Sequence, residues 1–307
     1  MAYTHNQSFK SQLLSLHSSN LPFSINSFKK EKNTHTHTAA AEERRRRGEM
    51  VGPTRPQIVL FGSSVVQMCY NVGGWGAILA DLYARKADVV LRGYSGWNTR
   101  MALQILDKVF PKDEATQPSL VILYFGGNDA TNPHPSGLGT HVPLPEFLEN
   151  MKKMILHIKN LSDKTRIICL TSPPINEKQI HAIFGDALSD QARTKEGCRI
   201  YSEALAELCQ ELDVVPINLW TAIQQKDDWA DTCFIDGIHL SAEGSKIVVG
   251  EILKVLKKVD WEPSLYWLSM ESEFPEDSPY YVVGPDGKNT FNVSTHICTW
   301  QREWLNI

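Results

Sequence analysis

The chain of 307 residues has no apolar run approaching the ~20 residues that span a bilayer, and its net charge at pH 7 is only −4. The absence of strong positive charge argues against a protein that binds nucleic acid or another polyanion. Its six cysteines are scattered and include no Cys-x-x-Cys pair, which favours reduced thiols in an intracellular protein over a disulfide framework. Hydrophobic and charged contents of 42% and 21% are typical of a soluble globular protein.

Metal-ligand motifs are also missing from most of the chain. The pattern His-x-His occurs only near the N-terminus, at His35 and His37, and the pattern His-Glu-x-x-His does not occur at all. Both patterns would bring ligands to one side of a metal ion. We therefore expect no metal and no other cofactor.

Residues 1–54 differ in composition from the rest of the chain. They are rich in Ser, Asn, Thr and His, contain four consecutive arginines at 44–47, and show no sustained apolar periodicity, so we expect disorder. The Ser-rich, basic stretch also permits an organelle transit peptide, and Met50 could instead be the physiological start. We expect an intracellular, cytoplasmic protein, with organelle targeting by this segment as the alternative.

From residue 57 onward, short apolar runs alternate with amphipathic stretches. Runs that end in turn residues are typical of the buried strands of a parallel sheet. The predicted strands are 57–61, 88–91, 120–125, 166–170 and 214–217, and the predicted helices are 75–86, 99–110, 144–161, 189–212 and 241–258. This alternation predicts βαβ units, and hence an α/β domain over 55–259 with a parallel five-stranded sheet covered on both faces.

The composition shifts again after Asp260. Residues 260–307 carry many aromatic side chains and the turn signal Gly-Pro-Asp-Gly at 284–287. So many exposed aromatic groups would make the protein insoluble, and we therefore expect an appendage packed on the domain. The alternative is that these side chains line the rim of a substrate channel.

Four groups of small or polar residues follow predicted strands or precede the last predicted helix. They lie at 62–64, 93–99, 126–129 and 236–239. The carboxyl ends of parallel strands meet at one edge of the sheet, where ligands bind in open α/β folds. We therefore expect the four groups to converge on a single site.

The residue types in these groups suit acyl transfer, which needs a nucleophile, a base, a group that orients the base, and donors for the oxyanion. Ser64 can attack, His239 can take its proton, and Asp236 can hold the imidazole tautomer. The backbone N–H groups of Ser64 and Gly96 and the side-chain amide of Asn128 can donate to the oxyanion, each worth roughly 3 kcal/mol of barrier. The predicted catalytic residues are therefore Ser64, Asp236 and His239, with an oxyanion hole of Ser64, Gly96 and Asn128.

The size of the substrate pocket is predicted from two neighbouring features. Trp97 follows Gly96 directly, and the loop 131–143, rich in proline and glycine, follows the Asn128 turn. A pocket closed by an indole and a stiff loop favours short acyl chains. The opposite possibility is an apolar channel for lipid chains, formed by the aromatic residues after Asp260.

Each group of residues also has a purely structural interpretation. Gly96 can serve only a tight turn, Asn128 can cap one, and His239 can be a satisfied buried histidine. The larger α/β-hydrolase fold is disfavoured because its motif is Gly-x-Ser-x-Gly, and Val66 occupies the position of the last glycine. A flavin-binding protein of related fold would not explain His239 and Asn128 together.

The sequence resembles the GDSL or SGNH hydrolases from about Met50 to its C-terminus. Within them it is similar to the isoamyl-acetate-hydrolysing esterase branch, and close to plant GDSL esterase/lipase proteins that open with Val-Gly-Pro-x-Arg-Pro-Gln-Ile-Val-Leu-Phe-Gly. The motif blocks of the family match at 61–64, Gly96, 126–129 and 236–239. One position departs from the family pattern, since Ser63 stands where an Asp usually precedes the nucleophile.

The resemblance implies a flavodoxin-like three-layer α/β/α sandwich. It also implies a serine esterase that hydrolyses small-molecule carboxylic esters through an acyl-enzyme, with Ser64, Gly96, Asn128 and His239 as the four namesake residues. Short acyl or acetyl esters are the expected substrates, and the alternatives are a carbohydrate deacetylase, a lipase, or a catalytically silent binding protein. We expect no nucleic-acid partner and no membrane span, and the sequence does not predict the oligomeric state.

Overall fold

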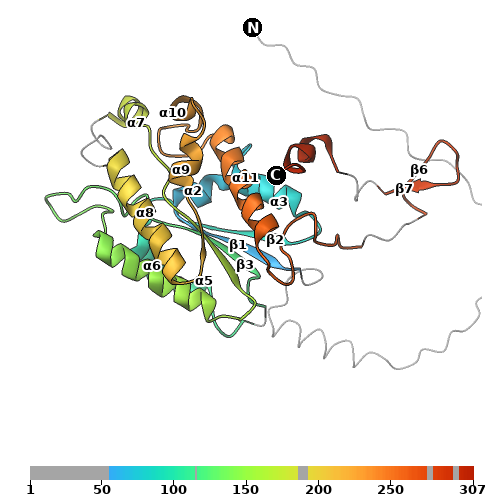
Figure 1. Ribbon diagram of the computed structural model, residues 1–307, viewed down its shortest axis with the longest axis horizontal. Helices are drawn as coiled ribbons and strands as arrows, with labels where there is room; N and C mark the ends of the chain where they lie inside the picture. Colours follow the sequence, from blue (N-terminus) through green and yellow to red (C-terminus); the bar gives the residue numbers. More distant parts are fainter. Residues whose placement is uncertain (1–54, 115, 186–192, 275–278, 293–296) are drawn as a thin grey trace, which may run out of the picture. The chain divides into compact units, whose positions relative to one another are not determined.

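A sheet of five parallel strands organises the part of the chain that the computed structural model describes, which is residues 55–307 without 115, 186–192, 275–278 and 293–296. The strands stand in the order β2-β1-β3-β4-β5 (Figure 1). Their bounds are β1 Gln57–Gly62, β2 Asp88–Gly93, β3 Leu120–Tyr124, β4 Arg166–Leu170 and β5 Val215–Ile217. The segment 1–54, with its predicted disorder, lies outside the described residues.

Alternate residues of the strands face opposite sides of the sheet, and each side has its own hydrophobic core. In β1, Ile58 and Leu60 belong to one core, and Val59 and Phe61 belong to the other. The helices of the first layer are α3 (Trp75–Leu82) and α11 (Ala242–Lys258), and those of the second are α4 (Thr99–Gln104), α5 (Leu106–Val109), α6 (Leu144–Lys159) and α8 (Lys195–Glu211). Figure 1 shows these helices on the two sides of the sheet, which confirms the predicted three-layer α/β/α sandwich.

The strand register brings the predicted site groups to one edge of the sheet. Every residue of β3 is buried, as expected for a strand with neighbours on both sides and helices on both faces. At the carboxyl end of β1, Gly62 lies opposite Gly93 of β2 and Tyr124 of β3. The chain segments that follow these three strands therefore start beside one another.

Several helices differ from the prediction. The predicted helix 99–110 is divided at Ile105, and α8 begins at Lys195, where the Thr194 hydroxyl accepts a hydrogen bond from the Gly197 N–H at 3.0 Å. The first part of the predicted helix 189–212 includes residues outside the described part of the chain. The short helices not predicted are α2 Ser64–Gln67, α7 Glu177–Phe184, α9 Leu219–Gln224 and α10 Trp229–Thr232. Helices this short hold too few apolar residues to show a helical period, although Asn caps mark α7 and α9.

The aromatic segment after Asp260 contributes to the core on the α3 and α11 side of the sheet. Leu265, Tyr266, Trp267 and Trp304 are buried there. The Tyr83 hydroxyl, at the end of α3 in the same core, donates to the Leu265 carbonyl at 2.6 Å. By contrast, the two-stranded hairpin of β6 (Val282–Val283) and β7 (Thr290–Phe291) exposes its side chains.

Two further observations concern the described residues only. None of their helices is long and apolar enough to cross a membrane. No three of their His, Cys, Asp or Glu side chains gather as ligands for a metal ion.

Candidate active site

The turn between β1 and α2 holds the predicted nucleophile. A Cβ atom on Gly62 would lie 2.3 Å from the Tyr124 carbonyl oxygen and 2.5 Å from Val66 Cγ2, so only glycine fits at this strand end. The Ser63 carbonyl then accepts the N–H groups of Val66 and Gln67, which starts α2 with Ser64 as its first residue. Ser64 is largely buried, with 7% of its surface exposed.

Ser63, at the position where the family usually has Asp, is almost fully buried at 3% exposure. It acts through its backbone, because its N–H donates to the Tyr124 carbonyl at 3.3 Å and its side chain makes no capping hydrogen bond to α2. Burying a carboxylate at this position would cost more free energy of desolvation than burying a serine hydroxyl. The departure from the family pattern therefore leaves the turn itself intact.

The segment after β2 carries Gly96 and Trp97. Gly96 has φ +79°, which favours glycine, and a Cβ atom there would meet nothing within 4 Å. Its neighbour Ser95 donates its N–H to Gln67 Oε1 at 2.8 Å, so α2 holds this segment next to the nucleophile turn. The Trp97 ring stacks on Tyr94 with centroids 4.5 Å apart. The space beside the Gly96 Cα is therefore open.

The Asn128 side chain is held at both of its polar atoms. Its Nδ2 donates to the Trp97 carbonyl at 2.8 Å, and its Oδ1 accepts from Arg193 Nη2 at 2.9 Å. Arg193 Nη1 also donates to the Gly127 carbonyl. An amide nitrogen carries two hydrogens, so one N–H of Asn128 remains for a substrate oxygen.

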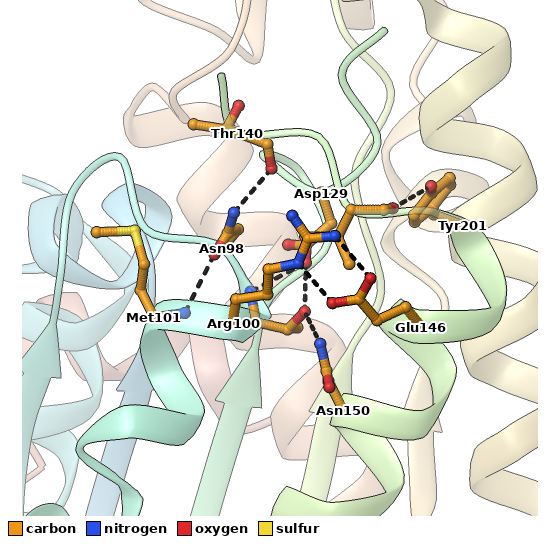
Figure 2. Close-up of polar contacts among 10 residues, drawn as sticks. Asn98, Arg100, Met101, Asp129, Thr140, Glu146, Asn150 and Tyr201 are labelled. Carbon is orange, nitrogen blue, oxygen red and sulfur yellow. Dashed lines mark hydrogen bonds and ion pairs between the residues drawn. The ribbon is translucent and has the colours of Figure 1, made fainter. Parts of the chain in front are cut away.

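Asp129 ties the Asn128 turn to the start of α4. Its carboxylate is fully buried, and Oδ1 accepts from the Thr99 N–H at 2.9 Å and from the Thr99 hydroxyl at 2.5 Å. The Thr99 hydroxyl in turn accepts from Asn150 Nδ2 at 3.1 Å, and Figure 2 shows Asn150 and Asp129 in this network. Burial raises the pKa of Asp129, and the hydrogen bonds from Thr99 offset part of that rise.

The base of the loop 131–143 is pinned beside the same turn. Asn98 Nδ2 donates to the Thr140 carbonyl at 3.0 Å (Figure 2), and the Val142 N–H donates to the Asp129 carbonyl. Residues 132–139, which include most of the prolines and glycines, are exposed. Only the base of the loop, and not its proline-rich tip, is therefore held close to Asn128.

Asp236 and His239 form a hydrogen-bonded pair within one loop. Asp236 Oδ2 lies 2.6 Å from His239 Nδ1, while Oδ1 accepts the backbone N–H groups of Ile238 at 3.0 Å and His239 at 2.8 Å. Burial acts to raise the pKa of Asp236, but these hydrogen bonds outweigh it and hold that pKa below its ordinary value. An ionised Asp236 thus accepts the Nδ1–H of His239 and leaves Nε2 as the basic nitrogen.

The loop of the Asp–His pair is shaped by two neighbours. Gly237 has φ +86°, and a Cβ atom there would lie 2.5 Å from the Asn176 carbonyl oxygen, so the position requires glycine. Asn176 donates its N–H to the Gly237 carbonyl and its Nδ2 to the Ala230 carbonyl. On the far side of the pair, Leu240 packs against the core cluster that contains Val65, the residue after Ser64.

The structure thus joins the predicted residues in two groups: a hydrogen bond links Asn128 to Trp97, the neighbour of Gly96, and another links Asp236 to His239 within one loop. Sequence reasoning missed Arg193, the Thr99 partner of Asp129, and Asn176. Arg193 has no local signal, because its contacts lie 65 and 66 residues away along the chain. Asn176 had a local signal, because Asn is a preferred N-cap residue. Its side chain accepts the Gln179 N–H in the first turn of α7.

A three-layer sandwich whose predicted site residues follow its parallel strands is the architecture expected of SGNH-type ester hydrolases. The chain belongs to the GDSL-like Lipase/Acylhydrolase family, whose family model matches residues 60–247. It is a carboxylic ester hydrolase by this membership, and the predicted resemblance is confirmed.

Relatives support this assignment, and a solved structure shares the fold. The chain is 58% identical to GDSL esterase/lipase CPRD49 of Arabidopsis thaliana, over 83% of this chain and 100% of that protein. It is 32% identical to the isoamyl acetate-hydrolyzing esterase 1 homolog of Bos taurus, over 72% of this chain and 90% of the relative. A lipase/acylhydrolase from Enterococcus faecalis, 18% identical, shares the fold with a TM-score of 0.53 over 73% of this chain and 100% of that chain.

Proposed function

We propose that the protein hydrolyses short-chain carboxylic esters through an acyl-enzyme on Ser64. The observation that carries the proposal is the Asp236–His239 pair, with 2.6 Å between Oδ2 and Nδ1 and with two backbone N–H groups on the other carboxylate oxygen. A carboxylate fixed in this way gives the imidazole one orientation and one tautomer, which is what a general base requires.

In the first half-reaction, the Ser64 hydroxyl oxygen attacks the ester carbonyl carbon while His239 Nε2 takes the hydroxyl proton. The carbonyl π electrons move onto the oxygen, and the resulting oxyanion accepts hydrogen bonds from the N–H groups of Ser64 and Gly96 and from Asn128 Nδ2. When the tetrahedral intermediate collapses, the bond to the alcohol oxygen breaks, and His239 gives its proton to the departing alcohol.

In the second half-reaction, water attacks the acyl-enzyme, and His239 Nε2 takes a proton from that water. The new oxyanion occupies the same donors, and its collapse breaks the bond to Ser64 Oγ. His239 returns the proton to Ser64, and the carboxylic acid leaves. The imidazole therefore serves as base and then acid in each half, with Asp236 stabilising the imidazolium form.

Two observations favour short acyl chains. The Trp97 indole stacks on Tyr94, and the hydrogen bond from Asn128 holds the Trp97 backbone, so a large aromatic side chain is held next to Gly96. A relative 32% identical to this chain is named for hydrolysis of isoamyl acetate, an acetyl ester. A tight pocket discriminates by about 1–3 kcal/mol for each misfitting methylene.

The test is a series of p-nitrophenyl esters with acyl chains of two to sixteen carbons. The proposal predicts that acetyl to butyryl esters exceed lauryl esters by at least about tenfold in kcat/KM. A value of kcat/KM that rises with chain length would instead favour a lipase.

A further inference from the structure

We propose that Arg193 is a positioning residue for the oxyanion hole, whose buried guanidinium fixes the orientation of the Asn128 amide and strengthens its remaining N–H as a donor. The inference rests on the proposed function, because it assigns Arg193 a role only if Asn128 contacts the oxyanion.

The burial of Arg193 is unusual for its residue type. Only 7% of its surface is exposed, and arginine is almost never this buried unless it is paired. Among the described residues, no carboxylate forms an ion pair with it; its hydrogen-bond partners are the Gly127 carbonyl and Asn128 Oδ1. Asp129, which follows directly, uses its carboxylate on Thr99. Both hydrogen bonds of the guanidinium are therefore made to the Asn128 turn.

Two glycines allow close packing around this turn. A Cβ atom on Gly127 would lie 2.8 Å from the Tyr124 hydroxyl oxygen and 3.6 Å from Arg193 Nη1. A Cβ atom on Gly197 would lie 2.8 Å from the Ala130 carbonyl oxygen, so the first turn of α8 packs tightly on the same segment. The backbone of Arg193 thus precedes a helix whose start is fixed against the oxyanion turn.

The two contacts of the Asn128 side chain select one of its two amide orientations. In the observed orientation Oδ1 faces a donor, Arg193 Nη2, and Nδ2 faces an acceptor, the Trp97 carbonyl. Rotation by 180° would place the NH₂ group against the guanidinium and Oδ1 against a carbonyl oxygen, and neither pair can form a hydrogen bond. Arg193 therefore keeps an N–H, rather than an oxygen, available for the substrate.

The charge of Arg193 also acts on the strength of that donor. A hydrogen bond from a cation to Oδ1 polarises the amide and makes its N–H groups more acidic, as hydrogen bonds in chains reinforce one another. A full negative charge on the substrate oxygen gains more from such a donor than a neutral carbonyl does. Arg193 should therefore act on kcat and leave KM nearly unchanged.

The experiment measures kcat and KM for p-nitrophenyl acetate with Arg193→Met and Arg193→Lys, each in the wild-type and the Asn128→Ala background. Arg193→Met should lower kcat by about 10- to 100-fold with KM within about twofold, and Arg193→Lys should recover part of the loss because it retains the charge. In the Asn128→Ala background, Arg193→Met should change kcat by less than about threefold. Arg199→Met, on the exposed side of α8, is the matched control and should have wild-type kinetics.

Equal losses from Arg193→Met in both backgrounds would overturn the inference, as would wild-type kcat in Arg193→Met. If Arg193→Met does not fold, Arg193→Lys carries the test: its loss of kcat should be smaller in the Asn128→Ala background, and an equal loss in both backgrounds would show a merely structural role. The proposed function fails separately, because it predicts that Ser64→Ala and Asn128→Ala lose activity whatever Arg193 does.

Discussion

The two halves of the candidate site are built in different ways. The Asp236–His239 half is local, because both side chains and both backbone N–H donors to Asp236 come from four consecutive residues. The oxyanion half combines Ser64, Gly96 and Asn128, which follow three different strands. A local pair is fixed by the conformation of one loop, whereas the oxyanion donors depend on hydrogen bonds between distant segments. The geometry of the first half should therefore depend mainly on its own loop and on Asn176, which contacts that loop, whereas the second half should depend on hydrogen bonds between several distant segments.

Those distant hydrogen bonds can be named. Gln67 of α2 accepts the Ser95 N–H, Asn128 donates to the Trp97 carbonyl, and Arg193 donates to Asn128. Each joins two segments that follow different parts of the sheet. Substitutions that remove a single residue or hydrogen bond can test the contrast between the two halves, because the resulting losses of activity and stability should differ between them.

The reacting pair should show the largest effect. Ser64→Ala and His239→Ala should each lower esterase kcat by at least about 10³-fold, and the double variant should lose little more, because nucleophile and base act as a unit. Steady-state kinetics on an activated ester measure this. Additive losses in the double variant would show that Ser64 and His239 act independently, which would contradict a nucleophile–base pair.

Asn128→Ala should have the next largest effect. Loss of one oxyanion donor should lower kcat about 10²–10³-fold with little change in KM, since the donor meets full charge only in the transition state. The same kinetic series measures both constants. An effect confined to KM would mean that Asn128 binds the substrate in its ground state.

Asp129 should affect stability through the link between the Gly96 and Asn128 segments. Asp129→Ala leaves both Thr99 donors without their acceptor and should lower the free energy of unfolding by about 1–3 kcal/mol, whereas Asp129→Asn keeps an acceptor and should be milder. Urea unfolding at fixed pH measures the difference.

The pH dependence of the same variants gives a second readout. Because the folded-state pKa of Asp129 is raised, the folded protein holds this proton more tightly than the unfolded chain does. Wild-type stability should therefore fall as pH rises from about 4, the ordinary pKa of Asp, through the raised folded pKa. Asp129→Asn has no proton to lose and should show a weaker fall, and identical pH profiles would contradict the assigned burial effect.

Substitutions of two glycines with positive φ should have the smallest effects, and they should separate a loss of stability from a loss of activity. Gly237→Ala meets both an unfavourable φ and the Asn176 carbonyl, so it should lower the melting temperature. Gly96→Ala meets the unfavourable φ alone, and its methyl group would enter the open space assigned to substrate. We expect Gly96→Ala to lower kcat/KM with a smaller loss of stability than Gly237→Ala, which thermal unfolding and kinetics together would measure. The reverse ranking would contradict the placement of Gly96 at the pocket.

The same contrast explains what could be predicted from the sequence. The apolar runs predicted all five strands of the main sheet, and a spacing of three residues was enough to predict contact between Asp236 and His239. The supports of Asn128 could not be predicted, because Arg193 is far away along the chain and a buried arginine has the same sequence signature as an exposed one. The Thr99–Asp129 hydrogen bonds were missed for the same reason, since they join residues that are 30 positions apart.

The central claim is that Ser64 is the nucleophile served by these two halves, and covalent labelling tests it most directly. The full-length protein is treated with a fluorophosphonate, and the adduct is located by mass spectrometry of its peptides. The account predicts a single adduct on Ser64 of the wild type, which is lost in Ser64→Ala and greatly slowed in His239→Ala. Stoichiometric labelling of another serine, or undiminished labelling of Ser64→Ala, would contradict it.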